Sequence, residues 1–304
     1  MDREKLLLLL KNCEIKMLRY TDVSGGFLLK KMKRISQLKF SYVFIFLLRK
    51  MNIEYTLKAE LFTGEEIILP ANDIDVGNLY FFGCISPKEL PLIKWMIKNV
   101  NTDEVFYDIG ANYGFYTHVA KQIAQNGHVH VFEPNPRLFG YLTKNLESDK
   151  NMTLNNIALS DHDGEIDFYI GATNTASGVG TIRSEVADTW KYDPLRQKVR
   201  CSKMDSYSTN KNTPTLIKLD VEGAEKSVID GMKVLLMTHS PVIAMEVWGG
   251  ARGDSYSLAA AELLLNSGYE VHKISEEGEI STVELSSITN HGSSFANYIF
   301  KRHA

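Results

Sequence analysis

The chain has 304 residues, of which 44% are hydrophobic and 23% charged, with 21 glycines and 8 prolines. This composition excludes a disordered, collagen-like or low-complexity chain, and the length allows one large α/β domain with an extension or two small domains. Three cysteines, Cys13, Cys84 and Cys201, are an odd number without the spacing of a zinc site. Neither a disulfide framework nor a structural zinc is therefore predicted, and a reducing cytoplasm is the expected compartment.

The charge is unevenly distributed. Residues 1–50 contain 12 Lys or Arg and 4 Asp or Glu, a net charge of +8, whereas the remaining residues carry a net charge of −11. This balance argues against a uniformly basic nucleic-acid binder, and no nucleic-acid partner is predicted, although the basic segment could bind phosphates or anionic lipid locally. The basic segment 1–50 is either a helical cap on the main domain or a surface for peripheral contact with anionic membranes.

No membrane span is expected, because the longest apolar run, from Phe40 to Leu48, has nine residues and a bilayer requires about 20. The run of five leucines at 6–10 leads to Lys11 rather than to a small-residue cleavage site. A secretory signal is therefore not expected either.

Residues 1–80 are predicted to form an N-terminal extension, ahead of a larger domain at 81–304. Apolar stretches at 6–10, 27–32 and 40–48 predict two or three basic amphipathic helices. Two strand-like runs on either side of Thr63-Gly64 predict a hairpin. The spacing of the apolar residues between Pro87 and Val100 predicts a helix.

From residue 105 onward, short apolar strands alternate with helices. Strands are predicted at 105–110, 128–134, 152–159, 215–221, 241–248, 269–274 and 295–301, and helices at 116–124, 137–147, 224–236 and 258–266. This order predicts an α/β, Rossmann-like fold with a seven-stranded, mostly parallel sheet whose last strand is antiparallel. Ligands are expected at the carboxyl ends of the strands, beside the first one.

The segment DIGANYGFYT at 108–117 lies where the first strand turns into a helix. Gly110 and Gly114 permit a tight turn, and the helix start offers unpaired N–H groups to a ligand. Glu133, at the end of the next strand, matches the carboxylate that takes the two ribose hydroxyls of a bound nucleotide. Together these features predict a nucleotide-type ligand.

Two details favour S-adenosylmethionine over NAD as this ligand. Asn112 stands where a dinucleotide loop has its middle glycine. Asp108 would repel a pyrophosphate, whereas its carboxylate can accept hydrogen bonds from the methionine part of S-adenosylmethionine.

A second acidic motif, LIKLDVEGAEKSVIDGM, occupies residues 216–232. Asp220 ends a strand, Glu222 and Glu225 lead into a helix, and Glu246 ends the following strand. These carboxylates are expected to converge as a general base, as ligands for a hydroxyl or amine, or as ligands for a divalent cation. The alternatives are helix capping for Asp220 or Glu222 and a solvated helix face for Glu225.

These segments resemble the FkbM-type S-adenosylmethionine-dependent methyltransferases over about residues 80–301. The similarity rests on YDIGANYGFYT, VFEPNPRLFGYLTKNL, NIALSDHDGEIDFY and, above all, KLDVEGAE. It implies a class I methyltransferase fold and methyl transfer to a hydroxyl of a sugar, glycan or other natural product. The acceptor would be a small molecule or a glycan, and no oligomeric state is predicted.

The resemblance also implies roles for individual residues. The methionine end of the donor would lie against Asp108, Gly110, Asn112 and Gly114, its ribose against Glu133 with help from Asn135, and its adenine against Asn156, Ala158 and Asp161. Asn156 is alternatively a turn residue. Asp220, Glu222 and Glu246 would face the acceptor.

Transfer to a hydroxyl requires a base, for which Asp220 is the first candidate, Glu222 the second and His291 the third. His291 is alternatively a solvated loop residue. Assistance by a divalent metal held by Asp220 and another carboxylate is an open alternative, although no metal site is predicted.

Acceptor choice is expected to lie in the irregular stretch 171–200, where Trp190 and Tyr192 could stack on sugar rings and Arg183 and Arg196 could bind acidic groups. A plain connector is the alternative. The rival functions are an NAD-linked sugar dehydrogenase or epimerase and a methyltransferase-fold scaffold without turnover.

Overall fold

The computed structural model describes residues 1–21, 45, 47–48, 50–51, 53, 55–73, 76–171, 180–189, 194–208, 213–248, 255–289 and 295–302. The described residues form two compact units, which divide between Leu90 and Pro91. The expected boundary after residue 80 stays a prediction, and it falls within helix α4 (Val76–Phe82).

The first unit begins with helix α1 (Arg3–Thr21), whose buried face consists of Leu6, Leu10, Cys13 and Met17. Strands β1 (Thr56–Glu60) and β2 (Glu66–Pro70) pair antiparallel. The turn between them includes Gly64 at φ 85°. The first helix and the hairpin are thus confirmed. The stretch 27–32 and most of 40–48 lie outside the described residues. Among the described helices, none has the length and apolar character to cross a bilayer.

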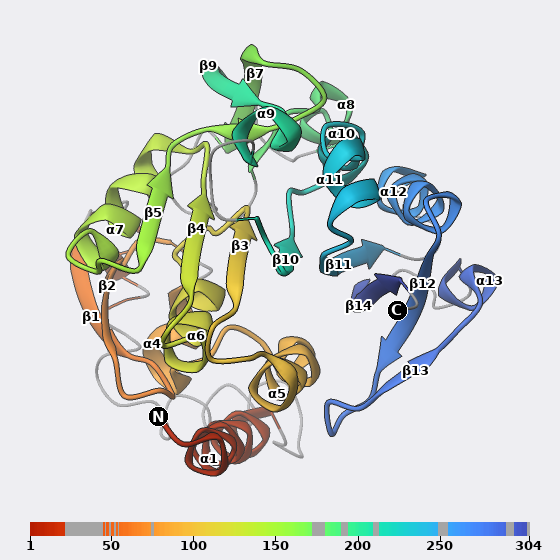
Figure 1. Ribbon diagram of the computed structural model, residues 1–304. Helices are drawn as coiled ribbons and strands as arrows, with labels where there is room; N and C mark the ends of the chain where they lie inside the picture. The colour runs from red at the N-terminus through yellow and green to blue at the C-terminus, as the bar shows by residue number, and fades with distance from the viewer. Residues whose placement is uncertain are drawn as a thin grey trace. The chain divides into compact units, whose positions relative to one another are not determined.

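The second unit contains an eight-stranded sheet in the order β13-β12-β14-β11-β10-β3-β4-β5 (Figure 1). Its strands are β3 (Val105–Ile109), β4 (His128–Phe132), β5 (Met152–Asn155), β10 (Leu216–Leu219), β11 (Val242–Trp248), β12 (Tyr269–Ile274), β13 (Ile280–Thr282) and β14 (Phe295–Arg302). The last strand, β14, is antiparallel to both neighbours, β11 and β12. The predicted class I methyltransferase sheet is confirmed, with β13 as an additional strand.

The helices of this unit are α5 (Leu90–Asn99), α6 (Phe115–Ile123), α7 (Pro136–Leu146), α8 (Ser184–Ala187), α9 (Met204–Ser208), α10 (Glu225–Asp230), α11 (Lys233–Thr238), α12 (Ser255–Asn266) and α13 (Leu285–Thr289). The single helix predicted at 224–236 was wrong, because the chain forms α10 and α11 there. Gly231 separates them, and a Cβ at this glycine would lie 2.0 Å from the Ser160 carbonyl oxygen. The close approach of the Ser160 backbone therefore requires a glycine at the position between the two helices.

A second sheet of four strands follows the order β6-β9-β7-β8, with β6 (Ala158–Leu159), β7 (Gly164–Gly171), β8 (Gly180–Thr181) and β9 (Pro194–Ser202). The single strand predicted at 152–159 is therefore wrong, since its second part pairs with β9 instead. The Asn156 amide donates to the Glu133 and Pro134 carbonyl oxygens, and the chain leaves the main sheet there.

The stretch 171–200 is also more regular than expected, because it contains β8, α8 and most of β9. In Figure 1, β7 and β9 lie beyond the arrowheads of β3 to β5.

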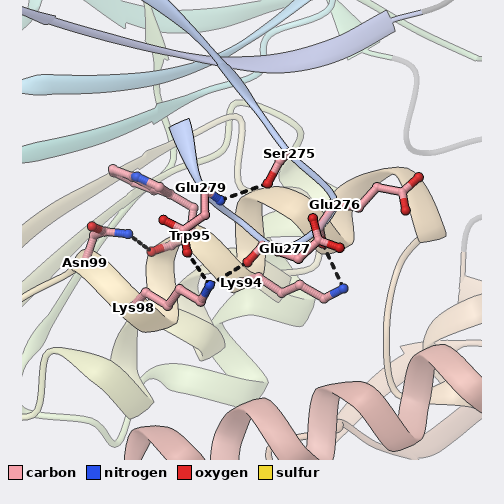
Figure 2. A network of polar contacts seen from close by, with 8 residues as sticks. All are labelled: Lys94, Trp95, Lys98, Asn99, Ser275, Glu276, Glu277 and Glu279. Atoms are coloured by element: carbon pink, nitrogen blue, oxygen red, sulfur yellow. Dashed lines mark hydrogen bonds and ion pairs between the residues drawn. The ribbon is translucent and has the colours of Figure 1, made fainter. Parts of the chain in front are cut away.

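Helix α5 is tied to the turn between β12 and β13 (Figure 2). The Lys94 ammonium donates to the Glu276 carbonyl oxygen at 2.9 Å. Lys98 donates to the Glu277 carbonyl oxygen at 2.7 Å and to a Glu279 carboxylate oxygen at 2.6 Å. A Cβ at Gly278 would lie 2.6 Å from the backbone nitrogen of Trp95, so the turn contacts the helix backbone directly.

Candidate active site

One face of the main sheet gathers ionisable side chains at the carboxyl ends of its strands. The register places Asp108 of β3 beside Lys218 of β10. Because side chains alternate along a strand, residues two positions further along each strand share that face. The ends of β3, β4, β10 and β11 therefore bring together Asp108, Glu133, Lys218, Asp220 and Glu246.

The loop between β3 and α6 follows a backbone path that glycine favours. Gly110, Asn112 and Gly114 all have positive φ, at 82°, 55° and 80°. A Cβ at Gly110 would lie 1.8 Å from the Asp220 carbonyl oxygen. The loops after β3 and β10 therefore meet backbone to backbone. The buried Oδ1 of Asn112 has no hydrogen-bond partner among the described residues, which leaves an acceptor for a ligand N–H or O–H.

Asp108 is 2% exposed and accepts a hydrogen bond of 2.5 Å from the Thr117 hydroxyl on α6. Burial raises the pKa of its carboxyl to about 6, against the opposing effects of the Thr117 bond and the Lys218 charge. The Asp220 charge raises this pKa further. These two carboxylates are thus close enough to repel each other.

Glu133 joins the loops after β3 and β4. One carboxylate oxygen accepts from the Asn112 N–H at 2.9 Å and the other from the Asn135 N–H at 2.8 Å. Burial raises the pKa of this carboxyl to about 7, although both bonds lower it. The Asn135 side chain accepts from the Arg137 N–H as the N-cap of α7. Glu133 and Asn135 therefore hold the expected ribose edge in place.

Lys218 is the site residue that the sequence analysis missed. Its side chain is buried in the middle of the sheet, with Nζ 3.1 Å from Asp220 Oδ2 and 5.1 Å from the centroid of the Tyr116 ring. A buried ammonium requires such compensation. The available signal was a lysine inside an apolar strand, two residues before an aspartate and on the same face.

Glu225 shapes the loop that follows Asp220. One of its carboxylate oxygens accepts from the N–H groups of Val221 and Gly223, each at 3.2 Å. The side chain is 3% exposed, so the alternative of a solvated helix face is wrong. Burial raises the pKa of its carboxyl to about 7, and the Asp220 charge contributes in the same direction. Glu222 has φ 50° in this loop.

The expected adenine segment follows β5. Ala158 is buried in β6, whereas Asp161 is half exposed and bonds to the Ser160 hydroxyl and His162. Asn156 makes the two turn-stabilising bonds described above. A cavity of about 410 Å³ opens beside this segment, lined by Leu154, Asn155, Asn156, Ile157, Asp163, Arg200, Cys201, Ser202 and Tyr207.

The remaining candidates differ in how the structure places them. Glu246 is buried near the end of β11, in register with Asn297 of β14. His291, Trp190 and Tyr192 lie outside the described residues. Within the described part of the chain, no three His, Cys, Asp or Glu side chains are grouped so that they could hold a metal ion.

Residues 108–278 match the family described as the Methyltransferase FkbM domain. The chain belongs to this family. The match covers more than half of the chain and includes the loops after β3, β4, β10 and β11. FkbM-family membership makes this chain a methyltransferase and favours S-adenosylmethionine over NAD as the ligand.

Two curated relatives are also methyltransferases by name. "Hexuronic acid methyltransferase AglP" of Haloferax volcanii is 27% identical over 192 residues, which cover 62% of this chain and 74% of that protein. "2-O-methyltransferase NoeI" of Sinorhizobium fredii is 30% identical over 144 residues, which cover 44% of this chain and 59% of that protein.

Similar solved structures include the methyltransferase FkbM of Methylobacillus flagellatus, at 12% identity and a TM-score of 0.43. That match covers 74% of this chain and 52% of the solved chain. The M. jannaschii TYW2 structure in complex with AdoMet has 13% identity and a TM-score of 0.42, and the match covers 82% and 88% of the two chains. The chain spans about half the length of the solved M. flagellatus FkbM protein.

Proposed function

We propose that this protein is an O-methyltransferase that uses S-adenosylmethionine to methylate a hydroxyl of a sugar or glycan. The observation that carries this proposal is Asp220, a partly exposed carboxylate held by a buried lysine at the carboxyl edge of a class I methyltransferase sheet. The names of the two relatives, which specify hexuronic acid and a 2-O position, support a sugar acceptor.

The loops after β3 and β4 fit the chemistry of the donor. Glu133 would accept the ribose hydroxyls, and the acceptor atom Oδ1 of Asn112 suits the donor's ammonium group. Asp108 supplies negative charge at the methionine end, and the segment after β5 would receive the adenine. When bound, S-adenosylmethionine supplies a methyl group that its sulfonium already makes electrophilic.

The chain's own task is then to align the acceptor hydroxyl and to remove its proton. Lys218 holds Asp220 through Oδ2 at 3.1 Å, and we propose Oδ1 as the oxygen that takes the proton. The Asp220 side chain is 35% exposed, so an acceptor can reach it. Glu246 and Glu222 would bind neighbouring hydroxyls. A positioned base contributes about 10²–10⁴-fold to such a reaction.

The decisive experiment measures binding and transfer in the same preparation. Calorimetry with S-adenosylmethionine, S-adenosylhomocysteine and NAD should detect binding of the first two only. Methyl-labelled donor and a panel of hexuronic acids and neutral sugars should then give labelled product. Binding without transfer to any glycan would favour the scaffold alternative, and tight NAD binding would refute the proposal.

Asp220→Asn preserves size and removes the charge of the proposed base. We expect normal donor binding and turnover slower by about 10²–10⁴-fold. Asp230→Asn is the matched control, because Asp230 forms ion pairs with Lys226 of α10 and Lys233 of α11. Full turnover in Asp220→Asn would move the base to Glu222 or His291. Loss of activity with EDTA and its recovery with Mg²⁺ would instead support metal assistance.

We further propose that the protein works in the cytoplasm and touches anionic membranes through residues 1–50. The cysteines are buried and free, which suits a reducing compartment. Helix α1 exposes Leu8, Ile15 and Leu18 on the side opposite its buried face, with Lys11 between them. An apolar stripe with basic residues is typical of interfacial helices.

A further inference from the structure

Arg183 lies where residues 180–187 cover the loop that follows Asp220. The Thr181 hydroxyl donates to the Glu222 carbonyl oxygen at 2.8 Å, which fixes this segment against the loop. A Cβ at Gly223 would lie 3.9 Å from Arg183 Cδ. The stem of Arg183 therefore passes directly over the loop, three residues after Asp220.

The guanidinium group of Arg183 is stacked on an aromatic ring. Its Cζ lies 3.4 Å from the centroid of the Tyr256 ring, at the start of α12. This stacking fixes the plane of the guanidinium and leaves its edge to bind in that plane. The ring belongs to the segment that follows β11, so the arginine is held between two segments that follow the acidic ends of neighbouring strands.

The edge of this guanidinium is incompletely satisfied. The buried Nε has no hydrogen-bond partner among the described residues. Nη2 is 3.8 Å from an oxygen of Glu185, whose side chain is 64% exposed, so that ion pair is weak. Nε and Nη2 together present two parallel N–H groups, the geometry that a carboxylate takes up with both oxygens. Nε itself has almost no accessible surface, so a carboxylate must displace the atoms that cover it in order to satisfy both groups.

We propose that Arg183 binds the carboxylate of an acidic acceptor sugar and thereby selects hexuronic acids over neutral sugars. This inference rests on the proposed function. Asp220, Glu222 and Glu246 make the edge of the sheet strongly acidic, so an anionic acceptor needs a fixed cation to approach it. Arg183 supplies that cation over the loop that follows the proposed base, and its stacked plane gives the sugar a defined orientation.

A second arginine provides a matched control. Arg196 on β9 was also a candidate for binding acidic groups, but it is 62% exposed and forms an ion pair with Asp167. Its Nη2 is thus already engaged within the second sheet. Arg196→Gln removes the same charge as Arg183→Gln from the same part of the chain without touching the proposed carboxylate site.

The test uses the full chain loaded with S-adenosylhomocysteine and measures binding of methyl glucuronoside and methyl glucoside by calorimetry. We expect the glucuronoside to bind more tightly, Arg183→Gln to weaken its binding by about 10- to 100-fold, and Arg183→Lys to weaken it less. Arg196→Gln should bind it like the wild type. Binding of the glucoside should be the same in all variants.

Two results would overturn the role of Arg183: equal binding of both sugars by the wild type, or unchanged glucuronoside binding in both Arg183 variants. Transfer of labelled methyl is measured separately. If no sugar of the panel described above is methylated although the glucuronoside binds through Arg183, the proposed function fails and the binding site stands. If the glucoside is methylated as well as the glucuronoside, the enzyme stands and the selectivity fails.

Discussion

Donor affinity should rise with pH because of Glu133. Its pKa of about 7 means that the carboxyl is roughly one-tenth ionised at pH 6 and nine-tenths ionised at pH 8. If the ionised form alone accepts the ribose hydroxyls, the apparent affinity scales with that fraction and increases about tenfold across this range. Calorimetric titration with S-adenosylhomocysteine at pH 6, 7 and 8, at constant ionic strength, measures this increase.

Glu133→Gln should bind the donor product about 10- to 100-fold more weakly at pH 8, since it loses a charge-assisted contact. Its affinity should also be nearly independent of pH between 7 and 8. Glu104→Gln, at the opposite end of β3, is the control and should behave like the wild type. A wild-type affinity that does not change from pH 6 to 8, or an equally steep profile in Glu133→Gln, would refute this reasoning.

Three further predictions concern other parts of the chain. Gly110→Ala should lower the free energy of unfolding in urea by about 3 kcal/mol or more, because the added Cβ meets backbone at 1.8 Å. Gly64→Ala, with a similar φ but open space, should cost only about 1 kcal/mol. Lys218→Met should raise the pKa of Asp108 above 6, because the lysine charge lowers that pKa in the wild type. NMR titration of the Asp108 carboxyl measures the change, and an unchanged pKa would contradict the prediction. Lys11→Glu should reduce sedimentation with anionic vesicles at low salt; equal sedimentation would show that α1 does not mediate the contact.

The stability of the protein should also depend on the pKa of Glu133. An unfolded glutamate titrates near 4.5, and folding raises this pKa to about 7. The folded state therefore binds the proton more tightly, so this contribution is fully present below pH 4.5 and is lost as the pH rises to about 7. Glu225 has the same direction of shift and the same cause. Urea midpoints of Glu225→Gln and the wild type should therefore diverge between pH 5 and 7, and parallel curves would contradict this.

The main sheet could be predicted from the sequence because most of its strands, such as β3, β4, β10 and β11, are buried on both faces and form short apolar runs. Turn chemistry was harder to interpret. Asn156 looked like a ligand contact or a turn residue, and its side chain in fact redirects the chain out of the sheet. The second sheet was missed because β9 has only two buried residues, Val199 and Cys201, while its Leu195 is exposed, so the strand has little apolar pattern.

The candidate site was predictable where a carboxylate lies near the end of an apolar strand, as at Asp108, or directly after it, as at Glu133 and Asp220. Lys218 was overlooked because a single lysine in a strand normally indicates a solvated face. The register with Asp108 and the distance to Asp220 show where its side chain lies. Glu225 was uncertain for a related reason, since helical spacing does not show that its carboxylate turns back to bind the N–H groups of its own loop.

The tie between α5 and the turn before β13 also constrains how the domain folds. Lys94 and Glu276 are 182 positions apart in the sequence. At a synthesis rate of roughly 5–20 residues per second, the turn that contains Glu276 is synthesised about 10–40 s after α5. The strand β14 comes later still and must insert between β11 and β12, which have no direct pairing without it. Non-local closure of this kind slows folding. Ending the chain before residue 295 would therefore leave two open strand edges inside the sheet, where they invite aggregation.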